Sequence, residues 1–488
     1  MPNNVLAFDF GAGSIRAILF TLDGGRLTSR EVHRFDNVPI EENGRMCWDI
    51  DTFVRESKVG LNKALAYGAI DSVGIDTWGG CYALLKDDGQ LWEKPIYGRG
   101  NVERTSALRH FQTDTQKDRV YDISGAFYIG FGILSQLSRM GEDGPFPGNI
   151  KAFLMMPDLI AYYLTGVCRN EETVLGSQAF LDARARAYSK ELFGMGEIPE
   201  GIFPGISPHG GVIGYVRDGI LPDGAGKIPV ITVAGHDTAS ACVAVPSAEE
   251  EFAYISSGTN SVVSTQLDAP VINELTKKYR LATELGYGNK WRLTMNIRAG
   301  MWLAQQCRAY WQSQGIEKTF AQLQQAAYEA APFRSFIDPA HPPLFFAGGL
   351  PDKMNKFLAD TGQEPITSIP ETMRCIYESL ALKYRFNLDS IEECTGKHFG
   401  KLYIVGGGSQ ADILNQMTAN ACKRTVVAGP AEAASIGNAL VQLIGLGAIK
   451  DIAEGRRVVA GSFQVKTFEP QDTDLWDRAA ERFAKVAG

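Results

Sequence analysis

The sequence predicts an α/β protein built from two similar halves. Short apolar segments alternate with helical stretches along the chain, which is typical of α/β architecture. Two strand–turn–strand segments of similar design, 5–20 and 252–264, lie about 250 residues apart, and each opens one half of the chain. Their similarity indicates a duplicated domain with a ligand between the halves. With 45% hydrophobic and 21% charged residues among 488, the composition excludes a disordered or coiled-coil protein.

The first half begins with an apolar strand, a turn rich in small residues and a second apolar strand. Glycine in that turn permits a positive φ and lets a ligand approach the backbone closely. Helical apolar spacing and short apolar runs define the elements that follow. In order, the first half is predicted to contain strands at 5–10 and 17–20, a helix at about 51–66, and strands at 71–77 and 227–234.

We place the domain boundary near Pro246, where three consecutive glutamates follow at 249–251. The predicted domains are therefore 1–244 and 245–488. The second half repeats the opening pattern, and later a long stretch with helical spacing leads into an apolar strand. Its predicted elements are strands at 252–257 and 261–264, a helix at 372–393 and a strand at 401–405.

The net charge and the targeting signals of the sequence indicate which partners and which cellular compartment to expect. Lys plus Arg number 48 and Asp plus Glu number 56, a net charge of −8 without a long basic stripe, so we expect no nucleic-acid or membrane partner. No apolar run reaches the ~18 residues of a membrane span, and the first residues lack a signal-peptide pattern. The eight cysteines form no C-x-x-C pair, so we expect reduced thiols in a cytoplasmic protein.

Two small-residue turns are candidate phosphate sites. Asp9 ends the first strand just before the turn at 11–14, and a carboxylate beside such a turn suits Mg²⁺ and a nucleotide. The turn at 256–259 offers hydroxyl and N–H groups to a phosphate. Taken alone, each segment is equally compatible with an ordinary β-hairpin.

Two further strand ends carry candidate chemistry. Gly406 to Gly408 could form a flat surface for a planar ring, or simply a tight strand–helix connection. Asp237 follows the strand at 227–234, where it could accept a proton from an attacking hydroxyl or merely cap a helix. Neither a G-x-G-x-x-G fingerprint nor a Walker A loop occurs.

In this order the four motifs resemble the actin/hexokinase-like ATPase fold, and more closely the FGGY family of carbohydrate kinases. The resemblance covers about residues 5–447 and implies two actin/ribonuclease H-like domains with a catalytic cleft between them. Within the family, several stretches are similar to the bacterial rhamnulokinases. They include 75–79, 156–158, 164–166, 235–241, 256–259, 404–410 and 428–433.

The resemblance implies a role for each matched position. Asp237 matches the catalytic base that accepts the proton of the sugar's 1-hydroxyl, and Asp9 matches the carboxylate near Mg²⁺. The positions matching ATP contacts are Gly11, Ala12, Gly13, Ser14, Arg16, Gly258, Thr259, Gln305, Gly406, Gly407 and Gly408. The positions matching ketose contacts are Gly79, His236, Thr238 and Asn296. The implied cofactors are ATP and Mg²⁺, and the implied partner is a small ketose bound by a monomer or homodimer.

Four segments depart from the rhamnulokinase pattern. Gly80 and Cys81 stand where a small residue and an Asp are usual, and Asn260 replaces a Trp; the segments 97–105 and 127–133 also differ. Loss of a carboxylate that binds a sugar hydroxyl would change the preferred sugar. The predicted substrate is therefore L-rhamnulose, phosphorylated on its 1-hydroxyl, with L-fuculose or another ketose or polyol as the alternative. A non-catalytic ATP-binding sensor is the alternative of another class.

Overall fold

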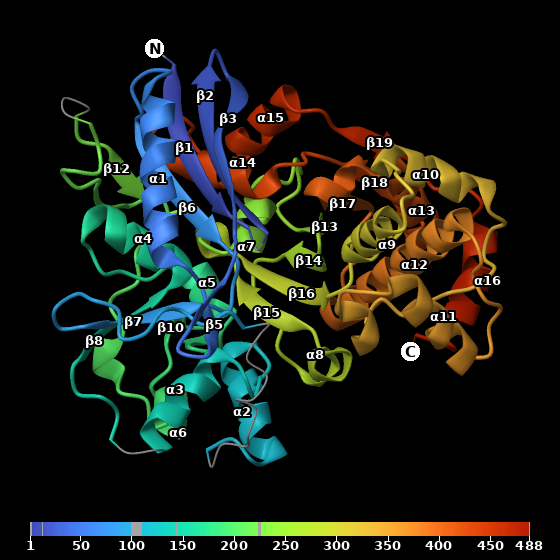
Figure 1. Ribbon diagram of the computed structural model, residues 1–488, viewed down its shortest axis with the longest axis horizontal. Coiled ribbons are helices and arrows are strands. Elements are labelled where there is room, and N and C mark those ends of the chain that lie inside the picture. Colours follow the sequence, from blue (N-terminus) through green and yellow to red (C-terminus); the bar gives the residue numbers. More distant parts are fainter. Residues whose placement is uncertain (1, 12, 99–109, 143–144, 223–225, 488) are drawn as a thin grey trace. The chain divides into compact units, whose positions relative to one another are not determined.

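The structure, a computed structural model, describes residues 2–11, 13–98, 110–142, 145–222 and 226–487 (Figure 1). The chain divides into two compact units, each assembled from three segments. The first unit comprises Met1–Ala248, Gln266–Leu293 and Ala433–Ser462. The second unit comprises Glu249–Thr265, Thr294–Glu432 and Phe463–Gly488.

The first unit is built on a six-stranded mixed sheet with the order β11-β12-β6-β1-β2-β3. Strands β12, β6 and β1 run parallel to one another, while β2, β3 and β11 are antiparallel to their neighbours. The strands of the sheet are β1 (Asn3–Phe10), β2 (Ser14–Asp23), β3 (Arg26–Asp36), β6 (Ser72–Thr77), β11 (Val212–Tyr215) and β12 (Pro229–Ile231). Because the three central strands are parallel, their carboxyl ends meet at one edge.

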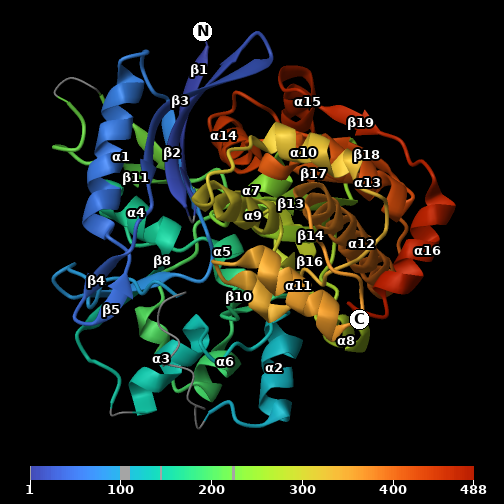
Figure 2. The same ribbon diagram turned by 45° about the vertical axis from the view of Figure 1, so that its right-hand side comes forward.

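Helices cover both faces of this sheet (Figures 1 and 2). On one face, α1 (Ile50–Leu65) and α4 (Met156–Thr165) share a hydrophobic core with Phe8 of β1 and Ile75 of β6. On the other face lie α7 (Asp237–Val243) and α14 (Ala433–Gly445), which pack against each other. The alternation of strand side chains therefore decides which residues meet which helices.

Polar residues of α14 face the sheet at helical spacing. Ser435, Asn438 and Gln442 lie on one stripe of α14, since residues three and seven apart share a face. Their side chains bond Asp9, Asp76 and Ser72, respectively, on β1 and β6. This buried network fixes α14 against the strands that carry the candidate site.

A glycine in α14 lets the two helices of that face approach closely. A Cβ atom on Gly437 would lie 1.8 Å from the carbonyl oxygen of Ser240 in α7. No side chain can occupy that space, because non-bonded carbon and oxygen atoms need more than 3 Å. The position of α7, which begins at Asp237, therefore depends on Gly437.

A smaller lobe of the first unit has its own core, in which Phe153, Phe180, Phe193 and Leu137 are buried. Its helices are α2 (Asp114–Ser124), α3 (Ile133–Glu142), α5 (Glu172–Gly176) and α6 (Lys190–Met195). Its strands are β7 (Tyr82–Lys86), β8 (Ile150–Met155), β9 (Leu181–Asp182) and β10 (Ala187–Tyr188). The remaining elements of the unit are β4 (Ile40–Glu42), β5 (Arg45–Cys47), α8 (Glu274–Tyr279), β15 (Ala282–Leu285) and α15 (Ile452–Ser462).

The second unit repeats the strand plan of the first. Its strands lie in the order β16-β14-β13-β17-β18-β19, with β13, β17 and β18 parallel and β16 and β19 antiparallel to their neighbours. The strands are β13 (Phe252–Ser257), β14 (Ser261–Gln266), β16 (Trp291–Ile297), β17 (Lys401–Val405), β18 (Thr425–Ala428) and β19 (Lys466–Phe468). The first residues of β16, up to Leu293, belong to the first unit. The helices are α9 (Trp302–Ser313), α10 (Phe320–Glu329), α11 (Leu350–Asp360), α12 (Ile369–Thr395), α13 (Asp412–Cys422) and α16 (Thr473–Phe483). The repeat agrees with the duplication predicted from the two strand–turn–strand segments.

Most predicted elements are confirmed within a few residues. The helix predicted at 51–66 is α1, the helix at 372–393 is α12, and the strand at 401–405 is β17. The strand predicted at 227–234 is shorter, since ladder pairing in β12 covers only Pro229–Ile231. The following residues stay close to β6, and the Thr77 N–H donates to the Gly235 carbonyl at 2.9 Å.

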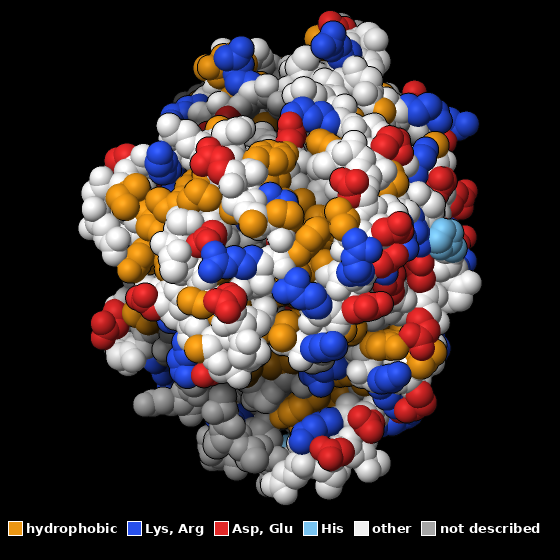
Figure 3. All heavy atoms as spheres, turned by 90° about the vertical axis from the view of Figure 1, so that its right-hand side faces the viewer, with side chains coloured by type: hydrophobic (Ala, Val, Ile, Leu, Met, Phe, Trp, Pro, Cys, Tyr) orange, Lys and Arg blue, Asp and Glu red, His pale blue; other side chains and the backbone are white. Residues whose placement is uncertain are grey.

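Three properties of the described chain bear on the sequence predictions. All eight cysteines are free thiols, and seven of them are buried. No helix in the described ranges is both long and apolar enough to cross a membrane. On the face drawn in Figure 3, basic and acidic side chains are interspersed.

Candidate active site

The candidate site of the first unit lies where the parallel strands β1, β6 and β12 end. Asp9 is the penultimate residue of β1 and pairs in register with Asp76 of β6. The chain leaving β12 pairs with Thr77 through His236 and then turns into α7 at Asp237. Strand ends of this kind are where α/β proteins bind ligands.

Asp9 is a buried carboxylate held by two donors on one oxygen. Arg16 of β2 donates from Nη2 to Asp9 Oδ2 at 2.5 Å, and Ser435 donates from Oγ to the same oxygen at 2.9 Å. Only 4% of Asp9 is exposed. No hydrogen bond engages Oδ1 among the described residues, so this oxygen is available to a cation.

Asp76 is fully buried behind this edge. Its Oδ2 accepts a bond from Asn438 Nδ2 at 2.7 Å, and its Oδ1 has no partner in the described part of the chain. Burial raises the pKa of Asp76 well above the ordinary aspartate value, and the charges of Asp9 and Asp237 raise it further. In the native state Asp76 therefore keeps its proton to a higher pH than an ordinary aspartate does.

Asp237 is the first residue of α7. Its Oδ1 accepts the Thr238 N–H at 2.6 Å, and 34% of its side chain is exposed. Loss of water around the carboxyl raises the pKa of Asp237, and the charge of Asp9 adds to this. A positive charge on His236, the Thr238 N–H and the charge of Arg292 each act in the opposite direction when present. An aspartate with a raised pKa, open to solvent on one side, is suited to accept a proton.

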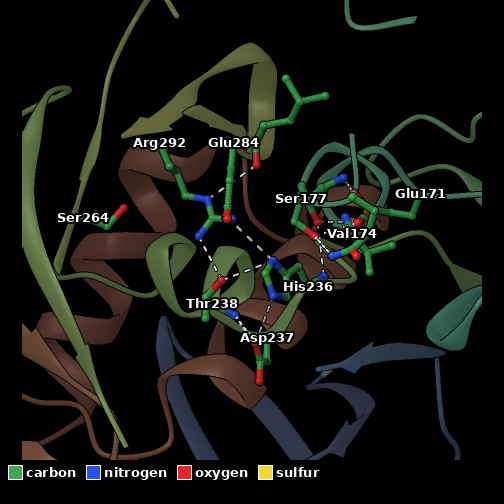
Figure 4. Close-up of polar contacts among 12 residues, drawn as sticks. Glu171, Val174, Ser177, His236, Asp237, Thr238, Ser264, Glu284 and Arg292 are labelled. Carbon is green, nitrogen blue, oxygen red and sulfur yellow. Dashed lines mark hydrogen bonds and ion pairs between the residues drawn. The ribbon is translucent and has the colours of Figure 1, made fainter. Parts of the chain in front are cut away.

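His236, Thr238, Arg292 and Glu284 form a connected polar network beside Asp237 (Figure 4). Arg292 Nη1 donates to Thr238 Oγ1 at 3.0 Å, and Thr238 Oγ1 lies 3.3 Å from His236 Nδ1. Arg292 Nη2 donates to Glu284 Oε2 at 2.5 Å. The sequence analysis did not identify Arg292 or Glu284. The available signal was a charged residue, Arg292, within the segment that forms β16.

A second hydrogen-bond network, which includes Thr173 of α5, holds the backbone at His236. The His236 N–H donates to Thr173 Oγ1 at 3.2 Å, and the Thr173 hydroxyl donates to Glu171 Oε2 at 2.7 Å. Glu171 Oε1 lies 2.6 Å from His209 Nε2. Burial would raise the pKa of Glu171, but its bonds to His209 and Thr173 hold that pKa below the ordinary glutamate value.

Gly79 lies close against the ring of His236. A Cβ on Gly79 would lie 3.0 Å from His236 Nε2 and 3.5 Å from Gln178 Nε2. The predicted ketose-contacting residues Gly79, His236 and Thr238 are thus brought together around one imidazole edge. Asn296, the fourth such residue, is exposed on β16 in the second unit.

The first glycine turn joins β1 to β2 and is tied to the chain after β3. The Gly11 N–H donates to the Ser14 carbonyl at 3.1 Å, and Asn37 Nδ2 donates to the Gly11 carbonyl at 3.0 Å. The Asn37 N–H donates to Gly13 at 3.3 Å. Ala12, also predicted to contact ATP, lies outside the described residues.

The predicted nucleotide residues of the second unit gather at one end of its sheet. Gly258 and Thr259 form the turn between β13 and β14, and their carbonyls accept the N–H groups of Met301 and Trp302 at the start of α9, which also carries Gln305. The triple-glycine turn lies at the end of β17, beside β13.

Gly406 and Gly408 are packed against the strand next to them. Gly406 has a φ of 85°, a left-handed value that favours glycine. A Cβ on Gly408 would meet the Ser257 Oγ at 2.0 Å. Gly407, by contrast, has no heavy atom within 4 Å of its Cβ position, so its surface is open.

The segments that depart from the rhamnulokinase pattern lie in different environments. Cys81 is buried in the core with its Sγ 3.9 Å from the Ile96 carbonyl, and burial raises the pKa of its thiol. The ring of Phe127 packs at a tilt against Tyr121, with ring centroids 4.4 Å apart, while Ile129 and Phe131 are exposed. Asn260 accepts the Gly258 N–H through its carbonyl. The part of 97–105 from residue 99 onward lies outside the described residues.

The donor set fits Mg²⁺ held partly by a substrate. No group of three or more His, Cys, Asp or Glu residues that could hold a metal occurs in the ranges the structure describes. Mg²⁺ in phosphate-transfer sites is usually bound by one or two carboxylates, waters and the phosphates themselves. Asp9, with one oxygen available, matches that pattern.

Comparison with solved structures identifies the fold. The chain matches gluconate kinase from Lactobacillus acidophilus with a TM-score of 0.78 at 15% identity, covering 100% of this chain and 98% of that one. It matches glycerol kinase from Plasmodium falciparum with a TM-score of 0.76 at 15% identity, covering 99% and 98%. The fold is therefore the two-domain, actin/hexokinase-like α/β fold of these kinases, as predicted.

The family follows from sequence comparison. The N-terminal domain of the FGGY family of carbohydrate kinases matches residues 4–244, and its C-terminal domain matches 253–446. The chain belongs to this family and is an ATP-dependent carbohydrate kinase. Its relatives include the rhamnulokinase of Bacteroides thetaiotaomicron, 36% identical over 99% of both chains. Another is the rhamnulokinase of Lactiplantibacillus plantarum, 34% identical over 97% of this chain and 96% of the relative.

Proposed function

We propose that this kinase transfers the γ-phosphate of ATP to the 1-hydroxyl of L-rhamnulose. The observation that carries the proposal is Asp237, a carboxylate with a raised pKa at the strand edge that also holds Asp9. Support for the sugar comes from full-length relatives named rhamnulokinase at 36% and 34% identity. We also propose that the domains divide near residue 244 and that the protein works in the cytoplasm, where its thiols stay reduced.

Asp237 would act as the general base. Its Oδ1 is occupied by the Thr238 N–H, which leaves Oδ2 to take the proton of the sugar hydroxyl. A raised pKa makes the carboxylate a stronger base, and proton acceptance is most useful late, as the new O–P bond forms. Gly79, His236 and Thr238 would bind the ketose so that its 1-hydroxyl reaches Oδ2.

Asp9 would hold Mg²⁺ directly or through water. The ion, when bound, neutralises charge on the phosphates during transfer. The bonds from Arg16 and Ser435 to Oδ2 fix the orientation of the carboxylate, so that Oδ1 would face the ion.

The glycine turns would bind ATP through backbone groups. We assign phosphate contacts to the turn at 11–14 with Arg16, and to Gly258 and Thr259. Asn37 keeps the first turn rigid through its bonds to Gly11 and Gly13. Gly406 to Gly408 and Gln305 would lie on the adenosine side, where the open surface at Gly407 suits a planar ring.

The experiment that tests the proposal is sugar-dependent ADP release with Mg²⁺ and a panel of acceptors. The panel contains L-rhamnulose, L-fuculose, L-xylulose, L-ribulose, D-xylulose and glycerol, with Asp237→Asn as the matched control. The expected result is the highest kcat/KM with L-rhamnulose and a product phosphorylated at carbon 1 by ³¹P and ¹³C NMR. A higher kcat/KM with L-fuculose would replace the proposed sugar. ATP binding without stimulation by any acceptor would instead support a non-catalytic sensor.

A further inference from the structure

We propose that Arg292, paired with Glu284, is a positioning residue that sets the hydrogen-bond direction at Thr238 and thereby holds His236 as its neutral Nε2–H tautomer. The structural part of this inference concerns the protein alone. Its catalytic consequence rests on the proposed function, because His236 and Thr238 act there on a ketose.

Arg292 is fully buried, and its guanidinium is fixed on several sides. Nη2 donates to Glu284 Oε2 at 2.5 Å, Nη1 donates to Thr238 Oγ1 at 3.0 Å, and Nε donates to the Leu285 carbonyl at 3.4 Å. Its exposed fraction is 0%. A buried arginine needs such partners, since an unpaired charge in the interior is very costly. Figure 4 shows the pair from β16 and β15 directed at the His236–Thr238 segment.

A guanidinium group can only donate, and this decides the role of the Thr238 oxygen. Thr238 Oγ1 must accept from Arg292, which leaves its own hydrogen for another acceptor. His236 Nδ1 lies 3.3 Å from that oxygen. If the hydroxyl donates to Nδ1, the ring nitrogen must be unprotonated, and the ring's hydrogen lies on Nε2.

The charges around the ring favour the same tautomer. Asp237 Oδ1 lies 3.6 Å from His236 Nε2, so an Nε2–H points a positive edge toward this carboxylate. The opposite tautomer would place the Nε2 lone pair there, and its Nδ1–H would share Thr238 Oγ1 with the arginine. Glu284 Oε2 is 3.9 Å from Nδ1, too far for a hydrogen bond, and Arg292 compensates its charge.

The result is a directed chain of donors from Arg292 through Thr238 to His236, whose Nε2–H faces Asp237 Oδ1 at 3.6 Å without a direct hydrogen bond. With the Thr238 N–H and the His236 Nε2–H both on the side of Oδ1, the other carboxylate oxygen of Asp237 is left for the acceptor hydroxyl. In Figure 4 that oxygen points away from His236 and Thr238. Because Gly79 has no side chain, which would otherwise lie 3.0 Å from Nε2, the Nε2–H is left uncovered on that side for a sugar oxygen as well.

The direct test is ¹⁵N NMR of the full chain with labelled histidine, at about pH 8.5 and without sugar. The signals of His236 are identified among the six histidines by their loss in His236→Gln. The expected wild-type spectrum shows an unprotonated Nδ1 and a protonated Nε2. In Arg292→Met the two ring nitrogens are expected to shift toward each other, because Thr238 then accepts from either partner and both tautomers are populated.

Arg292→Met alone leaves the charge of Glu284 without its partner, so a variant that removes both charges serves as the control for misfolding. Glu284→Gln combined with Arg292→Met removes both charges at similar volume, a change that folded proteins often tolerate. It is expected to give the same convergence of the two ¹⁵N shifts. A wild-type Nδ1–H, a doubly protonated ring, or unchanged shifts in both variants would overturn the proposal.

Kinetics test the catalytic consequence. Thr238→Val and Arg292→Met should each lower kcat by about tenfold to a hundredfold, and the double variant should lose no more than the worse single one. Thr238→Ser should restore most of the loss, because it restores the hydroxyl. Full additivity of the two losses would contradict action through Thr238. Since the NMR arm needs no sugar, an incorrect substrate assignment would leave its result unchanged.

Discussion

The contact between α7 and α14 makes Gly437→Ala a sharp test of how the site is held. The added methyl carbon would lie 1.8 Å from the Ser240 carbonyl oxygen and 2.7 Å from its carbonyl carbon. Both atoms belong to backbone, so no side-chain rotation relieves the overlap. The two helices must separate by more than an ångström.

The expected cost follows from what the two helices carry. Overpacking of a well-packed core costs about 1–3 kcal/mol, and a clash with backbone lies at the upper end of that range. Separation also strains the bonds from Ser435 to Asp9 and from Asn438 to Asp76, while α7 begins with Asp237. Displacement of reacting groups by about 1 Å lowers kcat roughly a hundredfold.

The assay is paired measurement of the urea unfolding midpoint and of kcat with the preferred sugar. The matched control is Gly461→Ala in α15, where the new Cβ meets no heavy atom within 4 Å. The control is expected to be neutral or more stable by about 0.5–1 kcal/mol, because alanine favours helix more than glycine does. If Gly437→Ala were as stable and as active as Gly461→Ala, the argument from helix packing would be refuted.

Three further predictions concern titration and space in the site. Because burial raises the pKa of Asp237, kcat/KM should fall with falling pH at a value above the ordinary aspartate pKa of about 3.9, and a flat profile down to about pH 4.5 would be inconsistent with this. Asp76 is buried and its pKa is raised in the native state, so between the unfolded and native pKa values the native protein keeps a proton that the unfolded chain has lost. The free energy of unfolding therefore decreases as pH rises through the native pKa. Asp76→Asn should therefore reduce the fall in unfolding free energy between about pH 5 and pH 8, by about 1.4 kcal/mol for each unit of the shift; an unchanged slope in urea titrations would count against it. Gly79→Ala places a methyl group 3.0 Å from His236 Nε2 and should raise the KM for the sugar roughly tenfold while the KM for ATP stays the same, which initial-rate kinetics can check.

The fold could be predicted largely because its signals are local. Alternating apolar residues define β1 and β17, and helical spacing defines α1 and α12. The discontinuous units could not be predicted in this way. The assignment of Ala433–Ser462 to the first unit depends on the long-range packing of α14 on β1 and β6.

The residues of the candidate site could be predicted from the sequence where they lie in turns or at the ends of strands. Asp9, His236 and Asp237 each follow a recognisable apolar strand, and pairing in the sheet explains why they meet. Arg292 and Glu284 lie on strands β16 and β15, about fifty residues after Asp237 in the sequence. Their contribution comes from burial and bond direction, which have no signature in a short sequence window.

The central claim is that Asp237 takes the proton of the acceptor hydroxyl, and Asp237→Asn tests it most directly. The amide keeps an oxygen for the Thr238 N–H and nearly the same volume, but it is not a base. Single-turnover and steady-state rates with saturating ATP and sugar should fall by about 10²–10⁴-fold, with the unfolding midpoint and sugar binding preserved. A rate within about threefold of the wild type, with the sugar still bound, would contradict the proposed role of Asp237 as base.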